Sequence, residues 1–422
     1  MENPRRPDAP LTQHARYQRL VASSLLALSM VLIVARGTGA RAHVPARPDA
    51  GFRPRPAETQ RVRVWLSEVV DESGDVGMYA SLALEPTRPH AAHVAYRDST
   101  NSALKHAWRT STGWLSETVD RDSRAEFASV ALEGVAPFTA HIAYNTGFGD
   151  SDLKHAWWTA GGWVSETVDR RGRVGRHASL ALAPTHPFTP HIAYWDQTNN
   201  GLKHAWCTAG GWASETVDTG QYVGWYASIA LAPVPPYTPQ IAYLGGGLQY
   251  NLRFAWRTSA GWLTETADME SFTGRYASLT LAPAPPFTPC VAYQGNAEDD
   301  LLYACRGPGG WEREVVDSDG DVGGQATMAL AGTVPYTPHI AYRSRSDQAL
   351  KHAWRAPGGW RTEVVGMASF EGLLRHTSLA LASTPPYTPQ IAYRDEQSDN
   401  LRYARRGPGY QILLPLILRT HP

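Results

Sequence analysis

Cysteine and lysine are scarce in this chain of 422 residues, which has three cysteines and four lysines. Three cysteines cannot form the dense disulfide framework of a small secreted domain, so the fold must depend on a hydrophobic core. Acidic and basic side chains balance at 39 each, and the lack of a basic surplus argues against a nucleic-acid-binding protein. The sequence also lacks an apolar run of the roughly 20 residues that a membrane-spanning helix needs. These absences leave a neutral chain that is long enough for one large core or two smaller ones.

The first 42 residues are expected to be a targeting segment rather than part of the fold. Arginines precede an apolar run of about 16 residues from Leu20 to Ala35, and the tripeptide Ala40-Arg41-Ala42 has the form of a signal-peptidase site. This pattern favours a cleaved secretion signal, with an uncleaved N-terminal anchor as the alternative. Residues 43–61 are rich in proline and arginine and are interpreted as a tether. The mature protein is therefore predicted to be secreted or extracytoplasmic.

Four short phrases recur seven times each between residues 62 and 409. The phrase W-x-S-E-T-V-D starts at tryptophans that are 49 or 50 residues apart, at Trp65, Trp114, Trp163, Trp212, Trp262, Trp311 and Trp360. Variants of "ASLAL", "HIAY" and "LKHAW" recur between them. All four are short, rich in β-branched and aromatic residues, and bounded by glycine, proline, asparagine or aspartate, as is typical of strands.

Four strands in each unit of about 49 residues predict an all-β fold, a seven-bladed β-propeller with four antiparallel strands per blade. "ASLAL" is small and apolar on both faces, which suits the innermost strand A. "HIAY" and "LKHAW" follow as strands B and C, and the alternating W-x-S-E-T-V-D phrase suits the outer strand D. Residues 410–422 remain as a C-terminal tail.

All four lysines occupy the second position of "LKHAW", at Lys105, Lys154, Lys203 and Lys351. If the tryptophans of a C–D hairpin lie opposite each other, Lys105 faces Glu117, and the other lysines face the equivalent glutamates. Opposite charges at such positions stabilise a sheet. We therefore predict a charged rung within each blade.

The same register predicts how the ring closes. Glu68 lies in the first D strand, which has no preceding C strand, and Arg402 lies in the last C strand and would otherwise face Leu413. Placing Val62 to Asp71 as the outer strand of the seventh blade lets Glu68 meet Arg402. We predict closure by the N-terminal strand, with Tyr410 to Leu418 as an extra edge or a docking tail.

Two of the three cysteines fall in one blade. Cys290 opens strand B and Cys305 closes strand C, and these strands are expected to be adjacent. An intra-blade disulfide would suit an exported protein, although the sequence alone does not fix the register. Cys207 is interpreted as a buried, small hydrophobic residue.

A Gly-Trp pair follows strand C in six units, in phrases such as "TSTGW", "TAGGW" and "GPGGW". Over roughly residues 62–410 these repeats resemble those of sialidase-type, Asp-box-like propellers, and they are similar to those of seven-bladed, fucose-lectin-like bacterial propellers. Threonine, alanine or proline stands where the Asp-box aspartate would be expected. The resemblance implies an extracellular propeller, and it implies its activity only weakly.

In such propellers the D-to-A and B-to-C loops form the ligand face, and two sets of residues in this sequence fall there. A mostly aromatic set precedes strand A, namely Tyr79, Phe127, His177, Tyr226, Tyr276, Gln325 and His376. Aromatic faces suit sugar rings, and the turn residues Asp98, Asp196 and Asp395 are candidate acceptors for sugar hydroxyls. The structural alternative is that the aromatic residues fill the space between blades and that the aspartates only form turns.

Arg176, Arg275 and Arg375 precede three members of the aromatic set, and three converging arginines would resemble the carboxylate-binding triad of sialidases. Glycoside hydrolysis also needs a second carboxylate at a defined distance, and no unique acid stands out. We therefore predict a multivalent carbohydrate-binding, lectin-like module, with a sialidase-like exo-glycosidase and a protein-interaction or structural scaffold as the alternatives. The expected partner is a glycan or another extracellular ligand. No cofactor, metal, nucleic acid or membrane contact beyond the N-terminal segment is expected.

Overall fold

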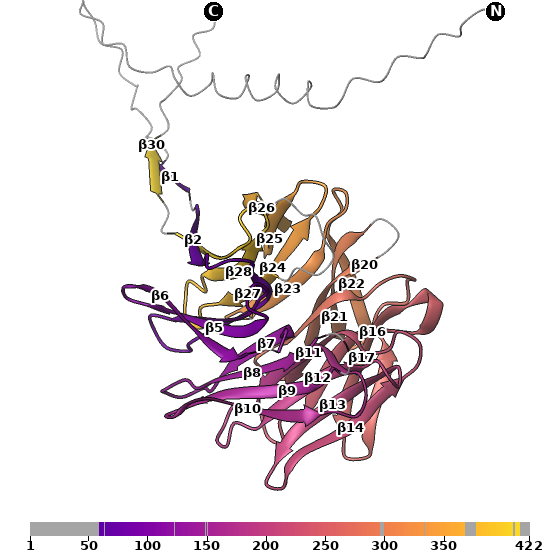
Figure 1. Ribbon diagram of the computed structural model, residues 1–422. Coiled ribbons are helices and arrows are strands. Elements are labelled where there is room, and N and C mark those ends of the chain that lie inside the picture. Colours follow the sequence, from indigo (N-terminus) through magenta and orange to yellow (C-terminus); the bar gives the residue numbers. More distant parts are fainter. Residues whose placement is uncertain are drawn as a thin grey trace, which may run out of the picture. The chain divides into compact units, whose positions relative to one another are not determined.

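The computed structural model contains seven four-stranded antiparallel sheets arranged as the blades of a propeller (Figure 1). It describes residues 59–413 apart from Arg63, Asp122, Phe148, Asp150, residues 296–298, Thr333, residues 368–376 and residues 408–409. Each sheet runs from strand A at the central channel to strand D at the rim, as the repeats predict. No helix in this part of the chain is long and apolar enough to cross a membrane.

The four strands of a blade keep the same order throughout. The A strands are β3 (Val76–Leu84), β7 (Glu126–Leu132), β11 (Val174–Leu182), β15 (Trp225–Leu231), β19 (Arg275–Leu281), β23 (Gly324–Ala331) and β27 (Thr377–Leu381). The B strands are β4 (Ala92–Asp98), β8 (Ala140–Asn145), β12 (Pro190–Asp196), β16 (Pro239–Gly245), β20 (Pro289–Gly295), β24 (Thr337–Ser344) and β28 (Pro389–Asp395). The C strands are β5 (Ala103–Thr110), β9 (Leu153–Thr159), β13 (Gly201–Thr208), β17 (Asn251–Thr258), β21 (Asp300–Gly307), β25 (Ala349–Ala356) and β29 (Asn400–Arg406). The D strands are β6 (Gly113–Asp120), β10 (Gly162–Asp169), β14 (Gly211–Thr219), β18 (Gly261–Thr266), β22 (Gly310–Asp317), β26 (Gly359–Met367) and β2 (Trp65–Asp71).

The N-terminal strand closes the ring, as the sequence predicts. β2 pairs antiparallel with β29 and is the outer strand of the seventh blade. β1 (Thr59–Val62) pairs with β30 (Tyr410–Leu413) in a separate two-stranded sheet. Strands from the two ends of the described chain therefore pair with each other, within blade seven and in this small sheet. The predicted signal segment 1–42, residues 43–58 of the tether and residues 414–422 of the tail lie outside the described residues.

The predicted register of the C–D hairpins is wrong by one residue. These hairpins close on a two-residue turn, which offsets the two tryptophans instead of placing them opposite each other. Lys105 therefore faces Thr118 rather than Glu117. A shift of one residue moves a side chain to the other face of a strand, so the charged rungs predicted within the blades do not form.

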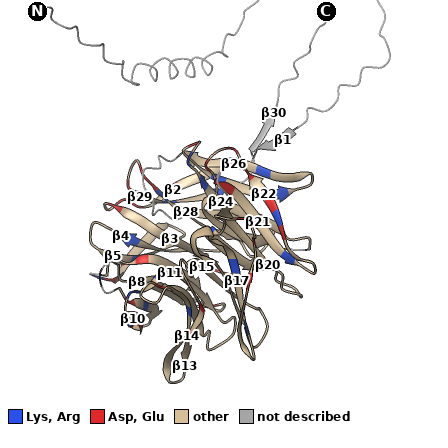
Figure 2. Ribbon diagram, turned by 90° about the vertical axis from the view of Figure 1, so that its right-hand side faces the viewer, with Lys and Arg blue, Asp and Glu red and all other residues tan. Residues whose placement is uncertain are grey.

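The lysines instead form ion pairs between neighbouring blades. Lys203 of blade three donates to Asp169 at the end of the outer strand of blade two, and the Tyr194 hydroxyl donates to the same carboxylate at 2.8 Å. Cation–aspartate pairs of this kind recur at Lys105–Asp71, Lys154–Asp120, Arg253–Asp218 and Lys351–Asp317. Basic and acidic residues are spread over several blades (Figure 2). Each such contact joins strand C of one blade to strand D of the preceding blade.

Two blades lack this arrangement, and each shows why in its own sequence. Leu302 replaces the lysine in blade five, and Asp268 pairs with Arg313 instead, at 3.6 Å. In the unit before blade seven the aspartate position holds a glycine, and Arg402 pairs with Asp395 of its own blade at 3.5 Å. In each case one partner is replaced, and the charged residue that remains pairs with another side chain instead.

Removing the aspartate from the most buried of these pairs is expected to destabilise the ring. Asp169→Ala leaves the Lys203 ammonium and the Tyr194 hydroxyl buried without their shared acceptor. We expect the free energy of unfolding, measured by urea denaturation, to decrease by about 3 kcal/mol. Adding Lys203→Leu, which copies Leu302, should recover part of this loss. Asp218→Ala is the matched control with a smaller expected effect, because that pair is more exposed. A loss below 1 kcal/mol for Asp169→Ala would contradict the stabilising role of the contacts that Asp169 makes with Lys203 and Tyr194.

Tryptophans and glutamates form a second ring of contacts at the rim. The indole N–H of each outer strand donates to the glutamate of the preceding outer strand at 2.6 to 3.2 Å. The seven pairs are Trp65–Glu363, Trp114–Glu68, Trp163–Glu117, Trp212–Glu166, Trp262–Glu215, Trp311–Glu265 and Trp360–Glu314. Glu68 also accepts from Arg109 at 2.7 Å, so its predicted pairing with Arg402 is wrong although the predicted closure is confirmed.

Hydroxyl groups join the blades at the channel. The second residue of each "ASLAL"-type phrase accepts from a backbone N–H of the adjacent A strand at 2.9 to 3.1 Å. The acceptors are Ser81, Ser129, Ser179, Ser228, Ser278, Thr327 and Ser378. Every pair of neighbouring blades, including seven and one, is therefore joined at its inner edge as well as at its rim.

Paired histidines lie between strands B and C of four blades, at His93–His106, His141–His155, His191–His204 and His339–His352. In blade six, His339 Nδ1 lies 3.0 Å from His352 Nε2, and His352 Nδ1 lies 3.0 Å from Glu363 Oε1. Neutral rings with the proton on Nδ1 satisfy this chain, because each ring then donates to the next acceptor. Burial, followed by the charge of the partner histidine, lowers the pKa of His93 and of His339 to about 3.

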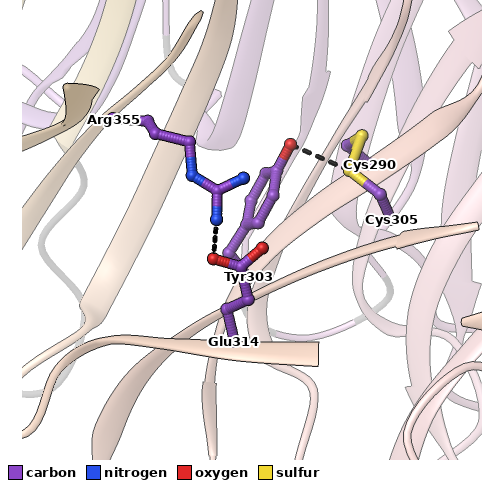
Figure 3. Close-up of a disulfide and its surroundings, with 5 residues drawn as sticks. All are labelled: Cys290, Tyr303, Cys305, Glu314 and Arg355. Atoms are coloured by element: carbon purple, nitrogen blue, oxygen red, sulfur yellow. Dashed lines mark hydrogen bonds and ion pairs between the residues drawn. A yellow bond between two sulfur atoms is a disulfide. The ribbon is translucent and has the colours of Figure 1, made fainter. Parts of the chain in front are cut away.

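A disulfide joins strands B and C of the fifth blade, as the positions of the two cysteines suggested (Figure 3). Cys290 and Cys305 lie directly opposite each other, at positions that hold histidine and tryptophan in blade one. The Tyr303 hydroxyl lies 2.8 Å from Cys305 Sγ and donates to it. Cys207 is the free cysteine, and burial raises the pKa of its thiol.

Candidate functional site

The loops that were expected to bind ligand lie together at one end of the propeller. Because the strands of each blade are antiparallel, the D-to-A and B-to-C loops share this end, which we call the loop end. The A–B and C–D turns share the opposite end, which we call the turn end. The site residues predicted from the sequence all belong to the loop end.

The aromatic set that precedes strand A forms a ring around the channel. Its described members have a left-handed backbone, with φ between 52° and 55°, at Tyr79, Phe127, His177, Tyr226, Tyr276 and Gln325. In each of the six blades in which it is described, this residue lies where the pairing of strands A and B is interrupted by a bulge. A bulge redirects a side chain, and here the repeated bulge allows five successive aromatic rings to meet.

These rings pack on one another in sequence. The ring centroids are 4.8 Å apart for Tyr79–Phe127, 4.4 Å for Phe127–His177, 4.7 Å for His177–Tyr226 and 4.6 Å for Tyr226–Tyr276. The channel cavity has a volume of about 170 Å³ and is lined by the four rings from Phe127 to Tyr276, together with the inner alanines and hydroxyl residues. Ligand sites of drug-sized molecules are typically about 300–1,000 Å³, so the rings leave little free space in the channel.

The three predicted aspartates lie in B-to-C turns and have partners within those turns. Asp98 is 2% exposed, and its two carboxylate oxygens accept from the backbone N–H and the side-chain amide of Asn101. Asp196 accepts from Asn199 in the same way. Asp395 accepts from the backbone N–H of Gln397 at 3.1 Å and pairs with Arg402. These contacts are those of turn formation.

The described arginines of the predicted triad lie in separate surroundings. Arg176 lies over the Phe127 ring at 5.4 Å and lines a cleft of about 100 Å³ with Arg173 and the buried carboxylate of Glu126. Arg275 donates to the Tyr250 hydroxyl at 2.9 Å and pairs with Asp299 at 3.5 Å. The contacts of Arg176 and Arg275 include no shared residue. Arg375 and His376 lie outside the described residues.

Sequence reasoning missed a continuous series of aromatic side chains at the loop end, which we call the aromatic arc: Trp195, Tyr222, Trp225, Tyr250 and Phe272. Successive ring centroids are 5.0, 5.5, 6.3 and 5.3 Å apart along the arc, in the order Trp195, Trp225, Tyr222, Tyr250, Phe272. Trp195 lies opposite Arg176 in the sheet, and Arg275 lies over Tyr250 at 5.7 Å, so an arginine stands at or near each end. Phe272 is 43% exposed.

The signal for the arc is a difference between units rather than a repeated feature. Tyr222 and Phe272 each lie two residues before the glycine that directly precedes strand A. Three other blades have a charged residue at the equivalent position, namely Asp75, Arg173 and Asp321. Repeats reveal what the fold requires in every blade, whereas a site confined to three blades occupies the positions where the units diverge. The indole N–H groups of Trp195 and Trp225 have no acceptor among the described residues.

The chemical environment does not favour a tyrosine nucleophile at the channel ring. Burial, followed by the charge of the neighbouring Tyr276, raises the pKa of Tyr226. A nucleophilic tyrosine would need its pKa lowered or a base beside it. Among the described residues, no cluster of three or more histidine, cysteine, aspartate or glutamate side chains is arranged to hold a metal ion.

No family model matches the chain, and no curated protein is similar to it in sequence. Solved structures do share the fold. A lectin of Burkholderia pseudomallei is similar over 80% of this chain and 99% of its own, with a TM-score of 0.57 and 16% identity. An ulvan lyase of polysaccharide lyase family 25 is similar over 78% of this chain and 94% of its own, with a TM-score of 0.50 and 10% identity. The α-L-arabinofuranosidase of Fusarium graminearum covers 83% of this chain and 98% of its own at 14% identity, with a TM-score of 0.46. At these identities the likeness shows the propeller fold alone.

Proposed function

We propose that the protein is a carbohydrate-binding, lectin-like propeller whose ligand rests on the aromatic arc of blades three to five. The arc itself carries this proposal, because its members Tyr222 and Phe272 stand at positions where three other blades have charged side chains, and Phe272 is exposed. Sugar rings combine apolar C–H faces with hydroxyl edges, and aromatic side chains beside arginines match both. The lectin and the polysaccharide lyase that share the fold are consistent with a saccharide ligand.

The polar groups beside the arc suit hydroxyl recognition. The cleft beside Arg176 has room for about three water-sized groups and contains the carboxylate of Glu126, which is 2% exposed, together with Ser151. Arg97 lies 3.4 Å from Glu126 and holds that carboxylate in place. A carboxylate and a guanidinium side by side can accept from one hydroxyl and donate to the next. The proposed ligand is accordingly a neutral saccharide with an apolar face and adjacent hydroxyls.

A glycan array with the purified protein tests this function, and loop variants locate the site. The double variant Tyr222→Asp/Phe272→Asp copies the residues of blades one and six, so we expect it to fold normally. Loss of two stacking surfaces is expected to weaken saccharide binding about tenfold or more.

Trp158→Arg is the matched control, because it removes an exposed tryptophan at the turn end and introduces the residue that blade one has there, Arg109. Equal loss of binding in both variants, or no glycan bound by the parent protein, would contradict the proposal. Turnover of a fluorogenic glycoside that is abolished by Arg275→Ala would instead identify a hydrolase.

A further inference from the structure

A third cavity lies at the turn end, at the seam between blades seven and one. It has a volume of about 920 Å³, within the size range of ligand sites, and we call it the seam cavity. Its wall includes the guanidinium groups of Arg88, Arg109, Arg405 and Arg406, and also His90. No aspartate or glutamate belongs to the part of its wall that the structure describes.

Comparison with the other blades shows that Arg405 and His90 are specific to the seam, whereas Arg109 and Arg406 occupy a position that also holds arginine in three other blades. Arg405 occupies the strand-C position at which five blades have tryptophan and one has cysteine. His90 occupies the A–B hairpin position at which the other six blades have phenylalanine or tyrosine. Blade seven also lacks the short C–D turn of the other blades, because its C and D strands are not consecutive in the chain. The seam therefore combines an unusual opening with cationic or polar residues that the repeat does not require.

Two of the four arginines are neutralised and two are not. Arg109 Nε donates to Glu68 at 2.7 Å, and Arg406 donates to Glu363 at 2.8 Å. Arg405 forms no hydrogen bond or ion pair with any residue that the structure describes.

Arg88 donates only to neutral oxygens, the hydroxyl of Thr384 at 3.4 Å and the carbonyl of Pro385 at 3.1 Å. Four cations against two carboxylates leave the cavity with an excess of two positive charges.

We propose that the seam cavity binds an acidic oligosaccharide through its carboxylate or sulfate groups. Guanidinium forks match such oxyanions, because they donate two parallel hydrogen bonds. A single inorganic ion would fill only a small part of 920 Å³, whereas the exposed rings of Pro89 and Pro386 in the same wall offer apolar surface to a larger ligand. This site lies at the opposite end from the aromatic arc and does not depend on the function proposed there.

Calorimetric titration of the full-length protein tests the seam cavity with three probes: a heparin-derived tetrasaccharide, a trigalacturonate and inorganic sulfate. We expect at least one oligosaccharide to bind with a dissociation constant below 1 mM. Arg405→Trp, which restores the residue of five other blades, is expected to weaken that binding at least tenfold. The exposed Arg88→Ala should weaken it severalfold, and it keeps the test valid if Arg405→Trp fails to fold.

Arg345→Ala is the matched control, because it removes one positive charge from an exposed side chain at the loop end. A change in the dissociation constant below twofold in this variant supports a local site. If Arg345→Ala weakens binding as much as Arg405→Trp does, the effect comes from the net charge of the protein, and the proposal is overturned. Sulfate binding as tightly as the oligosaccharides, or no binding by any probe, would also overturn it. The Tyr222→Asp/Phe272→Asp variant should still bind the acidic oligosaccharide. The proposal for the seam cavity can therefore be tested independently of the proposal for the aromatic arc.

Discussion

A chain that begins after Asp71 is expected to lose the folded propeller. This truncation removes β2, so strand β29 becomes an unpaired edge and the seventh blade keeps three strands. The seven blades form a ring that is stable only when each blade covers its neighbours, and an exposed edge strand promotes aggregation. We expect the truncated chain to be insoluble, or to unfold at a temperature at least 10 °C lower than the parent.

The side chains of β2 explain why the effect should exceed that of removing one strand from one blade. Trp65 donates to Glu363 of blade six at 3.0 Å, and Asp71 accepts from Lys105 and Tyr96 of blade one. β2 therefore joins three consecutive blades. Its removal takes away the closest carboxylate of Lys105, a side chain with little exposure, and leaves only Asp98 at 4.0 Å as an ion-pair partner among the described residues, a loss that adds to the missing strand pairing.

A chain that begins at Thr59 is the control for this experiment, since it keeps β1 and β2 while lacking the preceding residues. Circular dichroism and size-exclusion chromatography of the two chains provide the measurement. Asp71→Ala in the longer chain isolates the part of the effect that comes from the link to blade one. A truncated chain after Asp71 that is soluble, monomeric and as stable as the control would show that closure by β2 is dispensable.

The closure illustrates how a sequence can predict the right topology through a wrong contact. The unpaired positions of Glu68 and Arg402 indicated that the two ends of the chain share a blade, and they do. The predicted contact is wrong because a two-residue hairpin turn offsets the tryptophans, and spacing along one strand does not reveal turn length. The count of repeats was sufficient for the fold, since every unit must bury the same faces.

The lysines show what the repeat pattern could not predict, namely the blade on which the partner of a side chain lies. Their single position in the repeat predicted a common electrostatic role in the blades that contain them, and every one does pair with a carboxylate. The partner lies on the preceding blade, however, and a pattern that repeats in each unit cannot distinguish a contact within a unit from one to its neighbour. The aromatic arc was missed for a related reason, because attention to shared positions passes over Tyr222 and Phe272, which are not shared.

Acid is expected to unfold the propeller well before its carboxylates are protonated. Burial and the charge of the partner ring lower the pKa of His93 and His339 to about 3 and that of His141 and His191 to about 4. An unfolded histidine has a pKa of about 6.5, so between pH 6.5 and about 4 the unfolded chain binds protons that the folded chain does not. The free energy of unfolding therefore decreases as the pH falls through this window.

The magnitude follows from the width of the window. Each histidine that stays neutral costs about 1.4 kcal/mol per pH unit below 6.5, so one such histidine costs about 2 kcal/mol at pH 5. The four histidines whose pKa is lowered to about 3 or about 4 therefore cost about 8 kcal/mol together. The aspartates that accept hydrogen bonds from a lysine and a tyrosine of the next blade lose their charge at lower pH. Burial opposes the charge of Asp169, but hydrogen bonds from Lys203 and Tyr194 hold its pKa below the usual value, so its stabilising charge is lost only as the pH falls below about 4.

Blade four provides the variant that separates the histidines from the carboxylates. There Gln240 and Phe254 occupy the histidine positions, and Phe254 packs on Trp256 and Trp311 as His204 packs on Trp206 and Trp262 in blade three. His191→Gln/His204→Phe transfers this arrangement, and Glu215 keeps its bonds from Trp262 and Arg257. Urea unfolding at pH 7 and pH 5 should show a difference about 2 kcal/mol smaller in the variant than in the parent.

The control for this variant is Gln240→Ala in blade four, which removes a packed polar side chain but no titrating group. It is expected to lower stability equally at both pH values, so that only the histidine variant changes the dependence on pH. If the difference between pH 7 and pH 5 is the same in all three proteins, the buried pairs are not the source of acid sensitivity. A histidine variant that becomes less stable at pH 7 yet less sensitive to acid would show that the pairs stabilise the neutral blade through the Nδ1 proton chain. That is the outcome that the geometry of His339, His352 and Glu363 favours.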